Sequence, residues 1–209
     1  MYRDVEWPTP DIFIEPSRHD KTPTNLPQNY KMTTLALSRS SPTNNTLTDG
    51  YGTVTYDVST PFSWRSSTTT IKRNGQVLAM IKWGVFGGSE LTMGGVSASL
   101  NDVFPRTGKL SSSRVFTTAD GERLKWKHKS TLQCVSADSG LPLATYNHKL
   151  FAGIRNKKST LDISPNAAHL TDILVVTWVI AEKKAQDERS AASSAGSSAA
   201  AASSASGGC

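Results

Sequence analysis

The sequence predicts a mainly β fold, an antiparallel β-barrel that encloses a hydrophobic C-terminal helix over about residues 165–188. Short stretches of alternating apolar and polar residues are separated by turn pairs such as Asn-Gly and Asp-Gly, which is typical of hairpins. The longest apolar run, 173–181, comes late in the chain and has no polar face. Low-complexity ends flank these features, so we expect one folded unit, 30–189, between two tails.

The strands are predicted from their turns. Segment 53–59 places Val54, Tyr56 and Val58 on one face, and 46–48 can pair with it across Asp49-Gly50. The clearest hairpin joins 68–73 to 76–83 through Asn74-Gly75, because a type I′ turn needs positive φ at both central residues. Further strands are expected at 113–118, 123–129, 131–136, 143–148 and 160–163. Segment 90–100 is interrupted by Gly94-Gly95, which suggests a bulge. The total is roughly nine to eleven strands, as in a barrel or sandwich.

The segment after Ser164-Pro165 differs from the rest. Serine is a good N-cap and proline suits the first helical position. The run 173–181 contains one polar residue, Thr177, and a charged, helix-favouring stretch follows it. Its β-branched residues would also suit a central buried strand, which remains the alternative. A helix that is apolar all round must be buried on every side, and the inside of a closed barrel allows this.

The two ends differ from the predicted domain in composition. Residues 1–29 contain five prolines and few periodic apolar positions, so we expect a disordered Pro-rich arm. Residues 190–209 are almost wholly Ser, Ala and Gly, which predicts a flexible tail with some helical tendency from alanine. No apolar run reaches the ~18–20 residues of a membrane span, and the start lacks a signal-peptide pattern. Two cysteines, Cys134 and Cys209, cannot build a disulfide framework, which favours the cytoplasm.

Several of these features together resemble a known family. The residues concerned are Arg114-x-Phe116-x-x-x-Asp120-Gly121-x-x-x-Lys125-Trp126-Lys127, the preceding Ala79-x-Ile81-x-Trp83, and the late apolar segment. They resemble an uncharacterised domain family abundant in mushroom-forming fungi, which is similar to the tubby-like, LURP-one-related and phospholipid scramblase domains. The resemblance implies a barrel of about twelve strands threaded by a hydrophobic helix. It implies no reaction.

The predicted core residues are large and apolar. Alternation and the resemblance together place these side chains inside the barrel: Trp83, Phe116, Trp126, Ile173 and Trp178.

The basic strand 123–129 is the main candidate for a binding site. Lys125, Lys127 and Lys129 alternate with Leu124 and Trp126, so the three ammonium groups should lie on the outer face. Lys72 and Arg73 would add to the same field if the strand order brought them close. Such a face serves either as a solvated surface that prevents strand pairing or as an anion site. Tubby domains bind phosphoinositide headgroups through basic residues of the barrel, so the resemblance implies the second use.

No catalytic, metal or cofactor site is expected. The chain lacks a phosphate-binding loop and a Gly-x-Ser-x-Gly elbow, and its four histidines are scattered. A pocket that gathered His128, His148 and Asp120 would change this expectation. Cys134 is expected as a small core residue. Nucleic-acid binding is disfavoured because Trp126 should point inward, away from the lysines.

The sequence therefore predicts a non-enzymatic cytoplasmic binding module with a net charge of +6. Its expected ligand is anionic phospholipid at a peripheral membrane contact. The alternative is a protein–protein interaction or structural domain with no lipid ligand.

Overall fold

The computed structural model describes residues 31–62, 67–84, 88–108, 111–128, 131–149 and 158–202, with the backbone alone described over 194–202. The predicted N-terminal arm, Lys129 and Cys209 lie outside these residues.

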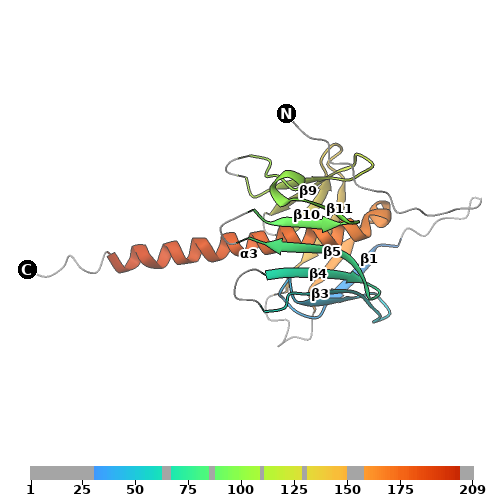
Figure 1. Ribbon diagram of the computed structural model, residues 1–209, viewed down its shortest axis with the longest axis horizontal. Coiled ribbons are helices and arrows are strands. Elements are labelled where there is room, and N and C mark those ends of the chain that lie inside the picture. Colours follow the sequence, from blue (N-terminus) through green and yellow to red (C-terminus); the bar gives the residue numbers. More distant parts are fainter. Residues whose placement is uncertain are drawn as a thin grey trace, which may run out of the picture.

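The described residues form twelve strands in one antiparallel sheet (Figure 1). The strand order is β7-β6-β5-β4-β3-β2-β1-β12-β11-β10-β9-β8, so nearly every strand pairs with its neighbours along the chain. The strands are β1 (Thr33–Leu37), β2 (Asn45–Thr48), β3 (Val54–Ser59), β4 (Ser67–Arg73), β5 (Gln76–Trp83), β6 (Glu90–Met93), β7 (Val96–Ser99), β8 (Arg114–Thr117), β9 (Arg123–His128), β10 (Leu132–Ser136), β11 (Pro142–Asn147) and β12 (Thr160–Ile163). A short helix, α1 (Leu100–Val103), follows β7.

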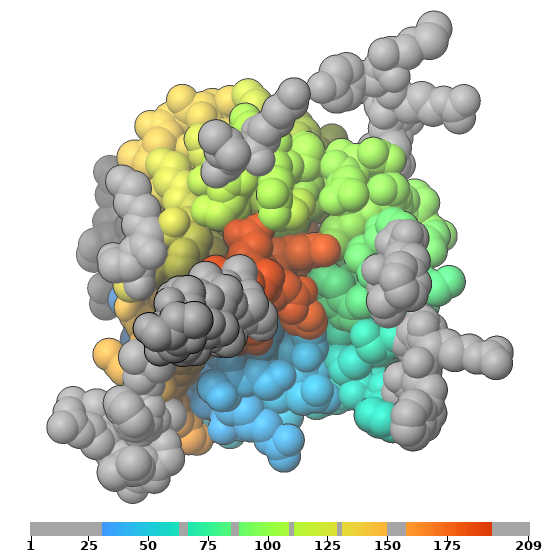
Figure 2. All heavy atoms as spheres, turned by 90° about the vertical axis from the view of Figure 1, so that its left-hand side faces the viewer, coloured from blue at the N-terminus to red at the C-terminus, as the bar shows by residue number. Residues whose placement is uncertain are grey.

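The sheet wraps around the C-terminal helix, α3 (Thr171–Ala202), which confirms the predicted fold class. Figure 2 shows the helix at the centre of a ring of strands where it leaves the barrel. Alternate residues of each strand face it: Ala79, Ile81 and Trp83 of β5 are buried, whereas Met80 and Lys82 between them are exposed. Residues 174–181 of α3 are all buried, as a helix without a polar face requires.

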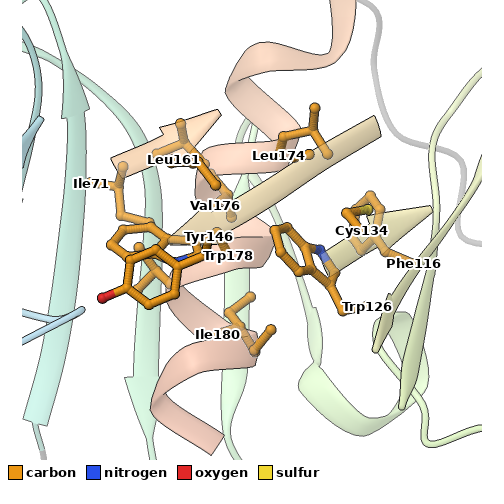
Figure 3. Packing of buried hydrophobic residues seen from close by; sticks show 14 of the residues in the cluster. Ile71, Phe116, Trp126, Cys134, Tyr146, Leu161, Leu174, Val176, Trp178 and Ile180 are labelled. Atoms are coloured by element: carbon orange, nitrogen blue, oxygen red, sulfur yellow. The ribbon is translucent and has the colours of Figure 1, made fainter. Parts of the chain in front are cut away.

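The centre of the core is built on α3 and the strands opposite it (Figure 3). Trp178 is fully buried, and its ring lies 5.3 Å from that of Tyr146 on β11. Thr177, the polar residue of the run, donates a hydrogen bond to the Ile173 carbonyl at 2.7 Å and accepts one from Trp126 Nε1 at 2.9 Å. The hydroxyl therefore joins the helix to β9 without leaving a buried polar group unsatisfied.

The helix differs from the prediction at both ends. The segment after Ser164 begins as a 3-10 helix, η1 (Pro165–Leu170), with Pro165 at its first position. The Ser164 hydroxyl donates to the Pro142 carbonyl and does not cap the helix. Beyond residue 188, α3 continues to Ala202 because the predicted tail is rich in alanine, the strongest helix former.

Most predicted hairpins are confirmed, with local corrections. Asn74 and Gly75 have φ of 49° and 83°, as the type I′ turn requires. Gly94-Gly95 forms the turn between β6 and β7, and the predicted bulge is wrong. Strand β1 was not predicted.

Val54 is about half exposed, although alternation placed it on one face with Tyr56 and Val58, and Val77 is about half exposed, although it alternates with the buried Ala79, Ile81 and Trp83. The register shifts opposite these residues, between Leu47 and Thr48 and between Ile71 and Lys72, explain this, because an extra residue in one strand breaks the alternation on either side of it.

The barrel has two distinct ends. Antiparallel order places the turns at 49–53, 74–75, 118–122 and 137–141 at one end, together with η1 and the start of α3. We name this the helix-entry end. The opposite end, where Trp83 and His128 finish their strands and α3 emerges, is the helix-exit end (Figures 1 and 2).

Candidate anion-binding surface

The lysines of β9 lie on the outer face of the sheet, and Leu124 and Trp126 between them are buried. Lys125 pairs with Val115 on β8 and Val135 on β10, and Lys127 pairs with Gln133 on β10. None of these neighbours is acidic. Within the described part of the chain, neither lysine forms an ion pair.

Arg123 begins the same strand and shares the outer face with Lys125 and Lys127. Its Nη1 atom lies 3.1 Å from Asp138 Oδ1, and both side chains are more than half exposed. An exposed pair of this kind stabilises little, but it neutralises the cation. On the outer face of β9, the charge of Arg123 is therefore compensated by a carboxylate, whereas the charges of Lys125 and Lys127 are not.

Lys72 and Arg73 lie elsewhere on the barrel. Six strands separate β4 from β9 in the sheet order. Lys72 is paired across the sheet with Asp57 on β3, and Arg73 Nη1 lies 2.7 Å from Asp172 Oδ2 on α3. These two cations do not add to the β9 face.

Asp172 joins β3, β4 and α3 at the helix-entry end. It accepts a 2.5 Å hydrogen bond from the buried Tyr56 hydroxyl as well as the bond from Arg73. Burial and the Asp172 carboxylate raise the pKa of Tyr56, and the same carboxylate raises the pKa of Arg73. The three groups lock the start of the helix to the wall of the barrel.

A hollow of about 320 Å³ lies beside this network. Two other polar groups that line it also have partners: His169 Nε2 lies 3.0 Å from Glu122 Oε1, and Asp49 Oδ1 accepts backbone N–H bonds within its own turn. Because carboxylates already compensate its cations, this hollow does not favour an anion.

The helix-exit end carries a denser group of charges. Glu182 is 3% exposed and accepts hydrogen bonds from Arg189 at 2.8 Å and from Gln186 at 3.1 Å. Arg189 also lies 2.9 Å from His128 Nε2, and Arg106 lies 2.5 Å from Glu188. These contacts tie α3 to β9 and to the segment before β8.

Arg114 is the functional candidate that sequence reasoning missed. It begins β8 and is 6% exposed; its Nη1 atom donates to the Phe104 carbonyl at 2.9 Å. Burial and the nearby Arg106 lower the pKa of Arg114, because both disfavour its charge. The available signal was alternation: Arg114 shares a strand face with Phe116, so an arginine at that position had to enter the barrel.

The large side chains expected in the core lie inside the barrel. Trp83, Phe116, Trp126 and Trp178 are buried, and Ile173 is partly buried against the same cluster. Cys134 is buried, which raises the pKa of its thiol.

The residues that would have indicated catalysis are not brought together. Asp120 lies in the β8–β9 turn at the helix-entry end, whereas His128 ends β9 at the other end of the barrel and His148 packs against the Tyr146 ring. In the ranges that the structure describes, no three His, Cys, Asp or Glu side chains gather as a metal site. Among the same residues, no helix is both long and apolar enough to cross a membrane.

Comparison with known proteins identifies the fold and the family. No curated protein matches the chain. The X-ray structure of the Arabidopsis thaliana protein AT5G01750, which has the LURP-one-related, tubby-like fold, is similar with a TM-score of 0.50 and 14% sequence identity. The match covers 73% of this chain and 90% of that one. The model of the "Family of unknown function (DUF6593)" matches residues 40–187, so the chain belongs to that family.

Proposed function

We propose that this domain is a non-enzymatic cytoplasmic module that attaches to membranes rich in anionic phospholipid, phosphoinositides in particular, through the outer face of β9. The observation that carries the proposal is that Lys125 has uncharged neighbours, Val115 and Val135, on both adjacent strands, and that Lys127 is paired with the uncharged Gln133 on β10. Like charges on one strand face repel, and an external anion relieves that repulsion. The resemblance to tubby-like domains supports phospholipid as the source of the anion.

The expected attachment is weak and reversible. Each basic residue close to an anionic surface contributes about 1 kcal/mol, and salt screens it over a Debye length of about 10 Å at 0.1 M. Val115 and Val135 flank Lys125, so the lysine stem can rest on apolar surface while the ammonium group reaches outward.

Co-sedimentation of the full chain with phosphatidylcholine vesicles, with and without a phosphoinositide, tests the proposal across a salt series. We expect headgroup-dependent binding at low salt that is lost in the Lys125→Glu/Lys127→Glu variant. The matched control is Lys72→Glu/Lys82→Glu, which changes the charge equally at positions paired with Asp57 and Glu90. Absence of binding at low salt, or equal losses in both variants, would contradict the proposal.

A protein-interaction domain is the second candidate function. The observation that favours it is a set of exposed apolar side chains near the helix-entry end: Met32, Tyr51, Val54, Val77 and Leu141. Tyr51 lies in the turn between β2 and β3, which are far from β9 in the strand order. A defined protein partner that still bound the Lys125→Glu/Lys127→Glu variant but not Tyr51→Ser would favour this candidate.

A further inference from the structure

A small pocket lies between β8, β9 and α3 at the helix-exit end. Its volume is about 10 Å³, close to what one water-sized atom needs. Arg114, His128 and Lys184 are among its polar lining residues, and Trp126 and Leu132 are among the apolar ones. The pocket therefore has room for one oxygen atom of a larger ligand, and the other atoms of that ligand would lie outside the pocket.

Arg114 supplies a buried donor that the protein does not use. The side chain is 6% exposed, and its Nη1 atom is bonded to the Phe104 carbonyl. Its Nε atom is buried and has no acceptor among the described residues. Buried charged donors are nearly always paired, because an unpaired one loses its hydration without compensation. The guanidinium therefore keeps hydrogen-bonding capacity beside the pocket.

The charges around the pocket are unbalanced toward positive. Arg114, Lys184 and the carboxylate of Glu188 line the pocket, but Glu188 is already bonded to Arg106, which leaves the two cations in excess. Burial and then the Arg114 charge lower the pKa of Lys184. His128 also lines the pocket, and its Nε2 atom lies 2.9 Å from Arg189 Nη1.

We propose that this pocket binds the oxyanion of a phosphate group, with Arg114 and Lys184 as its cationic ligands. Arginine presents a planar fork suited to phosphate oxygens, and lysine adds a mobile point charge. That the pocket binds an anion is argued from its lining residues. That this anion is a phosphate, and not another oxyanion, rests on the proposed function. His128 directly follows Lys127, so a phosphate held here would adjoin the β9 face.

The indole N–H of Trp126 reports on the site, because Trp126 lines the pocket. In an NMR titration of the full chain, inorganic phosphate replaces chloride at constant ionic strength. We expect a saturable shift of that signal. Lys184→Gln should weaken the apparent affinity by about tenfold or more, as the loss of one charge-assisted hydrogen bond does.

Lys183→Gln is the matched control. Lys183 and Lys184 are adjacent, carry the same charge and lie 5.6 and 5.7 Å from the centroid of the Trp83 ring, but only Lys184 lines the pocket. The control breaks the exposed ion pair of Lys183 with Asp187, which lies outside the pocket, and should change the affinity by less than about twofold because salt screens that charge. Arg114→Gln is a second variant, used if its melting transition shows that it folds.

A shift that does not saturate, equal weakening by both lysine substitutions, or the same response to chloride would overturn the proposal. A soluble inositol phosphate distinguishes the sources: tighter binding than inorganic phosphate assigns the site to a headgroup, and equal binding assigns it to free phosphate. The titration uses no membrane, so it succeeds or fails independently of vesicle attachment through β9.

Discussion

The two ends of the barrel handle their cations differently. At the helix-entry end, Arg73 and Arg123 each contact a carboxylate, and these contacts anchor α3 and link the β8–β9 and β10–β11 hairpins. At the helix-exit end, Arg106 and Arg189 are also paired with carboxylates, but Arg114 and Lys184 line a pocket whose carboxylate, Glu188, is already bonded to Arg106. The same residue types therefore serve structure at both ends, and at the helix-exit end two further cations remain available to an anion. In this domain, a basic residue indicates an anion-binding site only where no carboxylate is paired with it.

Both ends depend on the apolar part of α3 between them, so disrupting it should have the largest effect. Trp178→Asp places a charge where the side chain is fully buried. Truncating a buried Trp costs about 3–5 kcal/mol, and an unpaired buried charge costs more, against total stabilities of about 5–15 kcal/mol. We expect no cooperative melting by circular dichroism. A soluble variant with a normal transition would refute the enclosed-helix account.

Trp178→Phe is the control for that experiment. Trp178 Nε1 has no hydrogen-bond partner among the described residues, so phenylalanine removes volume but no bond. The variant should fold with a lower melting temperature.

The structural role of the helix-entry end is tested by Asp172→Ala. This change leaves the buried Tyr56 hydroxyl without its acceptor, which should cost about 1–3 kcal/mol in urea unfolding. Asp138→Ala removes the acid of an exposed pair with Arg123 and should cost less than about 1 kcal/mol. If both substitutions lowered the free energy of unfolding equally, burial would not explain the difference expected between these two contacts.

The buried acid of the helix-exit end should affect alkaline stability through Tyr146. Burial, followed by the charge of Glu182, raises the pKa of Tyr146 to about 12. The unfolded chain releases this proton near its ordinary value of about 10, so stability falls as pH rises between about 10 and 12. From pH 9 to 11, Tyr146→Phe should lose about 1 kcal/mol less than the wild type. The free energy of unfolding of both proteins is measured in urea at pH 9 and at pH 11. An equal decrease for the wild type and for Tyr146→Phe would contradict this prediction.

The smallest effect is expected outside the barrel. The described side chains from Ser190 onward are exposed, so deleting 190–209 should change the free energy of unfolding by less than about 0.5 kcal/mol. Deletion from Ile173 onward should instead abolish folding, because the barrel loses its filling. A loss above about 1 kcal/mol for the shorter deletion would assign the emerging helix a stabilising role.

Much of the fold was predictable because its signals are local. Asn74-Gly75 indicated a hairpin because both residues readily adopt the positive φ of a type I′ turn. The run 173–181 indicated a buried segment because nearly all of its residues are apolar. Strand β1 was missed because no turn pair directly marks its start. Bulges exposed Val54 and Val77 because register depends on partner strands, which alternation within one strand does not reveal.

The candidate site was less predictable. Alternation placed Lys125 and Lys127 together because they share one strand. The separation of Lys72 and Arg73 from them depends on strand order. The Arg114–Lys184 pocket joins a strand to a helix 70 positions later, and no local pattern encodes such a contact.

The most direct test of phosphoinositide binding through β9 compares three charge reversals of equal magnitude. The three residues differ in whether an acidic side chain lies next to them. Lys125→Glu, Arg123→Glu and Lys72→Glu each change the net charge equally, and affinity for phosphoinositide vesicles is measured for all three at one low salt concentration. Lys125 has no acidic neighbour across the sheet, whereas Arg123 contacts Asp138 and Lys72 is paired with Asp57. The account predicts that Lys125→Glu loses most of the binding while Lys72→Glu keeps it and Arg123→Glu falls between them. Equal losses in all three would mean that net charge alone drives attachment, and would contradict a site on β9.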